Sequence, residues 1–465
     1  MKRTINKKFN ILEILLIISP IIDILTSITQ RNLRLSISIG TIIRGAFLAF
    51  MVVYLVIKSN YKYKKISIIY LLALAIYFMI YIASTYINKR NNMLFELSEL
   101  IKAFYFPICI VTILNYMETE RYTLKPQMFF AIMLEYITLL FIPAIFKLGY
   151  GSYTGERVGQ IGFFFSGNEV SAIYSILFPF IVFSYDYIKN KILYFAMAIY
   201  SLYTIMQVGT KLPAIAAIIS ILGFTVVEVI RNVSETKKEK IKFITIGGTL
   251  SIACLGICLF SPISENFYIY KDYLISTRET ELASTEPINE ENKELLNIEN
   301  EEEIIIEDSY VNAEKKDEQT LTSDEMATII NSGRIEVKDK LKNNFKNYTV
   351  VDKLIGLGKI DVKNNTYNLS EIDYYDIFFN FGYLGFILYF MPIITLIIFT
   401  IRRINLSKIK EIIYDNSACC YGGGCAIAFI LCAISGHAFV APSVSIFISL
   451  MILGLYKKFE KGQER

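Results

Sequence analysis

Apolar runs of about 20 residues recur along this chain of 465 residues, and they limit its fold more than any other feature. A helix needs roughly 20 apolar residues to cross ~30 Å of hydrocarbon, and only helices or closed barrels satisfy their backbone hydrogen bonds there. Hydrophobic residues make up 54% of the chain, and the mean hydropathy is +0.45, which is too apolar for a water-soluble protein of this size. The sequence therefore predicts an all-α integral membrane protein.

We expect about twelve transmembrane helices, because that many runs reach spanning length. The first follows a basic segment without a small-residue cleavage site, so we interpret it as an uncleaved span rather than a signal peptide. The expected spans are residues 10–29, 36–57, 66–87, 96–116, 127–147, 169–187, 191–209, 212–230, 241–260, 377–401, 415–434 and 437–456.

Lysine and arginine collect in alternate loops, and cytoplasmic loops carry such an excess. The basic side carries residues 1–8, 58–65, 120–125, 188–191, 231–242, 402–411 and 457–465. The other side is poor in basic residues apart from Lys89-Arg90. This pattern predicts a multi-pass protein of the cell membrane with both termini in the cytoplasm.

One long polar segment, residues 261–376, separates expected spans nine and ten, and the alternation places it outside. Its acidic part, residues 279–325, is too polar to bury a core, so we expect it to be disordered. Residues 327–376 have a mixed composition and are expected to fold as a cap over an outer site. The chain thus divides into residues 1–260, 261–376 and 377–465, a GT-C-like arrangement with a large extracytoplasmic loop.

The sequence offers no expected metal or cofactor site. All seven cysteines lie in expected spans without zinc-ligand spacing, and the chain has one histidine. There is no P-loop or dinucleotide fingerprint, and we interpret residues 422–424, three glycines, as close helix packing. We expect membrane lipid as the surroundings and no nucleic-acid partner.

Basic residues near the expected outer surface point to an anionic substrate, and a lipid diphosphate is the simplest one, since Arg grips phosphate oxygens bidentately and Lys adds a point charge. The candidates are Arg157, Lys211, Arg334, Arg44 and Lys102.

Each candidate has a simpler alternative. Arg44 and Lys102 could pair with Asp23 and Glu99, because charges inside membranes usually pair or reach for the surface. Lys211 could be an interfacial anchor and Arg334 a solvated helix charge. The one histidine, His437, could be structural.

Short patterns follow one another at the outer side. An Arg precedes a Gly and then an Asn that opens a helix; a Thr-Lys pair opens a small-residue helix; a Gly-Arg pair precedes two glycine-containing elements. The residues are Arg157 with Gly159 and Asn168, Thr210-Lys211, Gly333-Arg334, residues 354–358 and residues 382–385. With the topology, these patterns resemble the O-antigen ligase and polymerase family of membrane glycosyltransferases.

The sequence departs from that family in two places. Many members have Arg where this chain has Lys211, and a His-Asn pair before the glycine-rich start of the tenth span. Here Glu371, Asp373 and Asp376 replace that pair, and the histidine lies farther on, at His437.

The resemblance implies an inverting, metal-independent glycosyl transfer that polymerises or ligates glycans on the outer face. The donor would be a glycan on undecaprenyl diphosphate, and the acceptor another glycan or a cell-surface molecule. Arg157, Lys211 and Arg334 would neutralise the leaving diphosphate. Asp373 or Glu371 is the first choice for the general base and His437 the second; the alternative for the acidic residues is helix capping.

Two other classes stay open. A polytopic transporter or flippase for a lipid-linked oligosaccharide would place ionisable groups near the bilayer midplane, where this sequence has few. A non-catalytic membrane protein could instead bind an extracellular partner through the acidic tract.

Overall fold

The computed structural model describes most of the chain outside the acidic tract. The described residues are 10–33, 38–87, 93–153, 158–233, 237–285, 334–358, 360–361, 366–367, 370–434 and 436–460. The chain divides into two compact units, one formed by Met1–Asn266 with Arg334–Arg465 and the other by Phe267–Gly333. All features of the candidate site described below belong to the first unit.

Eleven helices among the described residues are long and apolar enough to cross a membrane, which confirms the all-α membrane class. They are α1 (Ile11–Asn32), α2 (Ile39–Ile57), α3 (Lys64–Ile87), α4 (Met93–Thr119), α5 (Pro126–Ile145), α6 (Gly167–Val182, continued by the 3₁₀ turn η1, Phe183–Asp186), α8 (Lys211–Arg231), α9 (Lys237–Leu259), α14 (Asp373–Ile401), α16 (Asn416–Ile434) and α17 (Pro442–Glu460). The expected seventh span, 191–209, is wrong in length, because α7 (Lys191–Met206) ends after 16 residues.

One end of the helical unit, which we call the basic end, carries ion pairs between lysines and acidic residues. Lys125 pairs with Glu13 at 3.1 Å, where α1 begins, and Lys457 pairs with Glu118 near the end of α4. Lys458 pairs with Asp415 at 2.7 Å, beside the amphipathic helix α15 (Leu406–Tyr414). These lysines lie in or beside the segments expected to face the cytoplasm.

The opposite end, which we call the cavity end, joins the end of α1 to the starts of α6 and α17. The Arg31 guanidinium donates to the carbonyl oxygen of Phe165 at 2.7 Å, and the Ser443 hydroxyl donates to Glu169. The candidate residues described below lie at this end.

Helices α6 and α17 form the centre of the unit, as their burial shows. They pack closely on α16 because its glycines leave room: a Cβ on Gly423 would lie 3.2 Å from Pro179, and one on Gly424 would lie 2.9 Å from the Ile176 carbonyl oxygen. The expected role in close helix packing is confirmed for Gly423 and Gly424, whereas a Cβ on Gly422 would approach only Leu455, at 3.9 Å.

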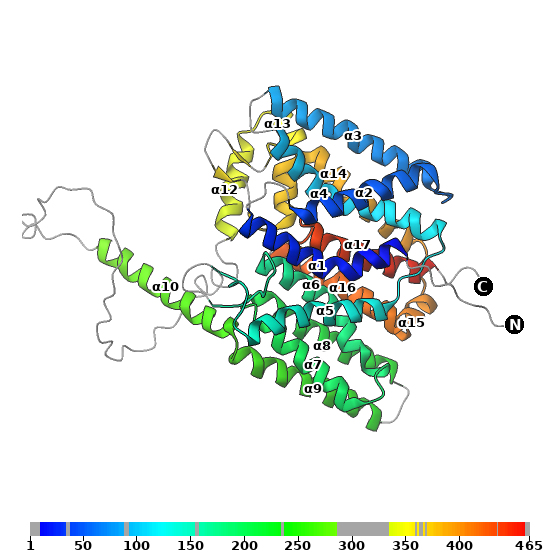
Figure 1. Cartoon of the computed structure of the whole chain (residues 1–465), viewed down its shortest axis with the longest axis vertical. Helices are drawn as coiled ribbons and strands as arrows, with labels where there is room; N and C mark the ends of the chain where they lie inside the picture. The colour runs from blue at the N-terminus through cyan, green and yellow to red at the C-terminus, as the bar shows by residue number, and fades with distance from the viewer. Residues whose placement is uncertain are drawn as a thin grey trace, which may run out of the picture. The chain divides into compact units, whose positions relative to one another are not determined.

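The long polar segment is partly ordered. Helix α10 (Pro262–Thr285) includes residues 279–285, so the start of the expected disordered tract is helical, whereas residues 286–333 lie outside the described residues. From Arg334 the chain forms α12 (Arg334–Lys346), α13 (Val350–Ile355) and two short antiparallel strands, β1 (Ile360–Asp361) and β2 (Thr366–Tyr367). Helices α12 and α13 pack against α14 (Figure 1).

Glycines of two patterns noted in the sequence allow the end of α13 to pack closely against a break in α14. Gly356 has φ +93°, and a Cβ there would lie 2.1 Å from the Asn380 carbonyl oxygen. Gly382 interrupts α14 with φ +64°, and its own Cβ would lie 2.6 Å from the Gly356 nitrogen. The Tyr77 hydroxyl lies 3.0 Å from the Ile355 carbonyl oxygen and 2.8 Å from that of Phe381. Only residues without a Cβ allow this approach.

We expect Gly356→Ala to lower the free energy of unfolding by roughly 1–3 kcal/mol, because the new methyl group meets backbone and the left-handed φ is strained. Thermal unfolding of the purified protein in detergent measures the change. Gly248→Ala in α9 is the matched control, since a Cβ there meets nothing within 4 Å. An equal melting temperature for Gly356→Ala and wild type would show that the two segments are not locked together.

Candidate functional site

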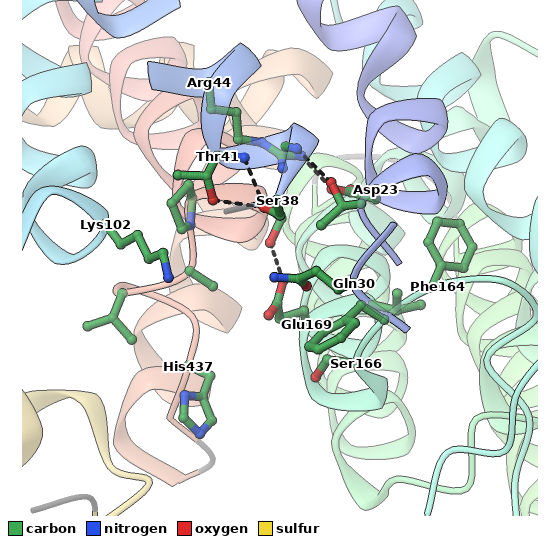
Figure 2. A pocket seen from close by; sticks show the side chains of 18 of the residues that line it. Asp23, Gln30, Ser38, Thr41, Arg44, Lys102, Phe164, Ser166, Glu169 and His437 are labelled. Carbon is green, nitrogen blue, oxygen red and sulfur yellow. Dashed lines mark hydrogen bonds and ion pairs between the residues drawn. The ribbon is translucent and has the colours of Figure 1, made fainter. Parts of the chain in front are cut away.

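A cavity of about 240 Å³ lies at the cavity end, between α1, α2, α4, α6 and the segment that leads into α17 (Figure 2). Three expected residues line it, namely Arg44, Lys102 and His437. They come from segments far apart in the sequence, so the fold brings together part of the set that sequence reasoning proposed.

The floor of the cavity is a buried ion pair. Arg44 Nη2 lies 2.5 Å from Asp23 Oδ1, and the two side chains are 6% and 12% exposed. The Tyr136 hydroxyl donates to the other carboxylate oxygen at 2.7 Å. Asp23 lies nine residues before the end of α1 at Asn32, which at ~1.5 Å per residue is about 13 Å below the helix end. The pairing considered as an alternative for Arg44 is therefore present, and it lies inside the cavity.

Lys102 is paired but more accessible. Its ammonium lies 2.7 Å from Glu99 Oε1, one turn away on α4, and its side chain is 34% exposed. In Figure 2, Lys102, Glu169 and His437 surround the same space. Of the two basic residues in the lining, Lys102 is the one able to swing toward a bound anion.

His437 lies on the short loop between α16 and α17, which we call the histidine loop. Hydrogen bonds to a buried carboxylate hold this loop in place. His437 and the preceding Gly436 both have φ +59°, a left-handed conformation that is unusual for histidine. The next two backbone amides, of Ala438 and Phe439, donate to Asp373 Oδ2 at 2.9 and 2.7 Å. Asp373 is 0% exposed, so the residue expected first as a general base is buried beneath the histidine loop.

Arg334 and Glu371 hold the other side of this loop. The guanidinium binds Glu371 Oε2 through Nη2 at 2.7 Å and Nε at 3.0 Å, and Nη1 donates to the Ile434 carbonyl oxygen at 3.1 Å. A Cβ on Gly436 would lie 2.4 Å from the backbone of Glu371. The histidine loop is thus held by three side chains, those of Arg334, Glu371 and Asp373.

For Asp376, the structure agrees with the alternative of a structural residue at the start of a helix. Its Oδ1 accepts hydrogen bonds from the Ser370 nitrogen at 2.6 Å and the Ser370 hydroxyl at 2.7 Å. Asp376 is buried with these bonds, so it ties the chain that enters α14 to the first turn of that helix.

Two further candidates, Lys211 and Arg157, are not among the described residues that line the cavity. Lys211 opens α8 and is absent from the cavity lining, while Arg157 lies outside the described residues. The neighbouring Thr210 shares a 2.6 Å hydrogen bond with Ser171 on α6. Asn266 donates to the carbonyl oxygens of Val158 and Gly209 at 2.6 and 3.0 Å, which holds the two loops together beside α8.

The charge of the cavity differs from the expected cluster of cations. Its lining contains the carboxylates Asp23, Glu99 and Glu169 beside Arg44 and Lys102. Sequence reasoning missed Glu169, which has the spacing of a helix-capping residue after Ser166. The signal that could have found it is an acidic residue at a helix start on the same side as His437.

A sequence profile of the family described as "O-antigen ligase like membrane protein" matches residues 5–461. No curated protein matches the chain.

Proposed function

This chain belongs to the family of O-antigen ligase like membrane proteins, which assigns it to glycan assembly at a membrane, and from that premise we propose that it is a glycosyltransferase. It takes a glycan from undecaprenyl diphosphate and joins it to a hydroxyl group of another glycan or a cell-surface acceptor. The observation that carries this proposal is the cavity in which Lys102, Arg44 and His437 come together at the end opposite the basic loops. Because basic loops face the cytoplasm, that end faces outward and both termini lie inside.

The reaction needs a base and a stabilised leaving group. The acceptor oxygen attacks the anomeric carbon, the bond from that carbon to the diphosphate oxygen breaks, and a base removes the hydroxyl proton. Attack opposite the leaving group inverts the anomeric centre. The diphosphate departs with the bonding electrons, so cations placed beside it lower the barrier.

His437 is the best placed base among the three candidates. It lines the cavity, whereas Asp373 is fully buried and bound by two backbone amides, and Glu371 is engaged by Arg334. We assign Asp373 and Glu371 to holding the histidine loop. This ranking reverses the order expected from the sequence, because burial removes Asp373 from contact with an acceptor.

The diphosphate is assigned to Lys102, which lines the cavity, and to Arg334, which lies outside the lining and holds the loop that carries His437. Arg334 and Lys102 would contact it directly, and Arg44 would support the floor through its pair with Asp23. For Lys211 and Arg157 we keep the proposal that they contribute further positive charge from the neighbouring loops. An anion competes with Glu371 for Arg334, so donor binding would loosen that pair.

Transfer by purified protein tests this proposal. The protein in detergent, with a chelator and a synthetic undecaprenyl-diphosphate oligosaccharide, should lengthen or transfer the glycan. We expect Arg334→Gln to lower kcat by on the order of 10²-fold, because it removes a cation from the leaving group. Arg402→Gln, an exposed arginine of the expected cytoplasmic loop, is the matched control and should transfer at the wild-type rate.

A carrier is the second candidate, favoured by one observation. The Arg44–Asp23 pair lies about 13 Å below the helix end, close to the middle of a ~30 Å hydrocarbon core, where transporters place their ionisable groups. Detergent removes any gradient, so transfer in detergent requires an enzyme. Absence of transfer by the wild type, with movement of the lipid-linked glycan across vesicles, would establish the carrier instead.

A further inference from the structure

Glu169 is a cavity residue to which the proposed reaction assigns no role. It lies in the first turn of α6 and lines the cavity with Arg44, Lys102 and His437. Within the described residues its one hydrogen-bond partner is the Ser443 hydroxyl, and no basic side chain forms an ion pair with it. The other two carboxylates of the lining, Asp23 and Glu99, each have a basic partner.

The local geometry departs from what the sequence around Glu169 favours. Ser166 and Glu169 have the spacing of a capping box, in which both side chains bind backbone amides at the helix start. Ser166 is the residue before α6, yet its side chain makes no capping hydrogen bond. Glu169 instead binds Ser443 at the start of α17. Departures from local sequence rules are expected at functional or strained positions.

Charge limits what Glu169 can bind. Two negative charges within a few ångströms repel, and the repulsion grows in a poorly solvated cavity. Within this cavity a diphosphate would therefore lie nearer to Lys102 than to Glu169. A carboxylate offers two oxygens with about four acceptor positions, and Ser443 occupies one of them. Hydroxyl groups are the neutral donors that match the remaining positions.

The neighbouring side chains fit the same ligand. Gln30, Ser38 and Thr41 line the cavity near Glu169 and offer neutral donors and acceptors (Figure 2). Sugar hydroxyls both donate and accept hydrogen bonds, so a wall that combines an amide, hydroxyls and a carboxylate suits them.

We propose that Glu169 accepts hydrogen bonds from hydroxyl groups of the acceptor sugar, and so holds that sugar in the cavity with its attacking oxygen toward His437. This inference rests on the proposed glycosyl transfer and adds a specificity-determining residue to it. It commits to the acceptor, since the donor sugar is bound to the diphosphate that Glu169 repels.

Binding of labelled glycans to the full-length protein in detergent tests the inference without turnover. A panel of fluorescent hexose and N-acetylhexosamine oligosaccharides identifies the ligand of the wild type by polarisation. We expect Glu169→Gln to weaken that binding at least tenfold. In the transfer assay, KM for the acceptor should rise by a similar factor while kcat stays within about threefold, since only substrate positioning is lost. Glu135→Gln, a partly buried glutamate of α5 outside the cavity lining, should change neither value.

Deoxy analogues of the best glycan sharpen the test. The analogue that lacks the contacted hydroxyl should bind the wild type as weakly as the parent glycan binds Glu169→Gln. Its affinity for Glu169→Gln should be no lower than its affinity for the wild type. Equal binding of all glycans by wild type and Glu169→Gln, or no binding by the wild type at all, would overturn the inference. A fall in kcat at constant KM with an altered pH profile would overturn it as well, because Glu169 would then be the base. Glycan binding through Glu169 without transfer would refute the enzyme and leave the sugar site standing.

Discussion

Replacement of His437 by asparagine should lower kcat for glycan transfer by roughly 10²–10⁴-fold, the range that a positioned general base contributes. Asparagine is the informative substitution because it tolerates the left-handed backbone of this position, φ +59°, better than alanine does. It preserves the loop and removes the group that accepts the proton. Measurement of kcat and KM with the lipid-linked donor at saturation gives the effect.

A matched control distinguishes loss of the general base from an effect of the substitution on the backbone. Lys147 also has a left-handed φ, +53°, and is exposed on the turn after α5, so Lys147→Asn makes the same kind of change outside the cavity. We expect it to transfer glycan at the wild-type rate and to melt at the wild-type temperature. If His437→Asn kept more than a tenth of the wild-type kcat while folding normally, His437 would not be the base.

The fold was predictable in class because its strongest signal is length. Eleven of the expected spans are helices of spanning length, since twenty apolar residues in lipid have one stable conformation. The length of α7 was not predictable, because an apolar run does not show where tertiary packing ends a helix. Helix α7 stops at Met206, and the next residues form the turn in which Gly209 packs on the Val158 carbonyl oxygen.

The sequence predicted the location of the candidate site residues better than the role of each one. Membrane topology put Arg334, Glu371, Asp373 and His437 at one surface, and the structure brings them around one loop. Topology does not reveal burial, which hides Asp373 and leaves His437 in the cavity lining. Glu169 was missed because its spacing after Ser166 is that of an ordinary helix start, and the contact with Ser443 joins segments 274 residues apart.

Two variants of Asp373 test whether it holds the histidine loop or acts as the general base, because they should differ strongly in stability and activity. Asp373→Ala removes the acceptor of the Ala438 and Phe439 amides, and each buried donor left without a partner costs about 1–3 kcal/mol. We expect a fall of about 2–6 kcal/mol in the free energy of unfolding and loss of transfer, because the loop that carries His437 is no longer held.

Asp373→Asn should behave differently. The amide oxygen can still accept from both backbone amides, and the nitrogen replaces Oδ1, which makes no hydrogen bond among the described residues. A neutral acceptor is weaker than a charged one by about 1 kcal/mol, so this variant should unfold slightly earlier and keep most of its kcat. A general base would show the opposite pattern, since asparagine takes up no proton and would lose as much activity as alanine. Thermal unfolding and kcat measured on both variants therefore decide whether Asp373 holds the histidine loop or performs the proton transfer itself.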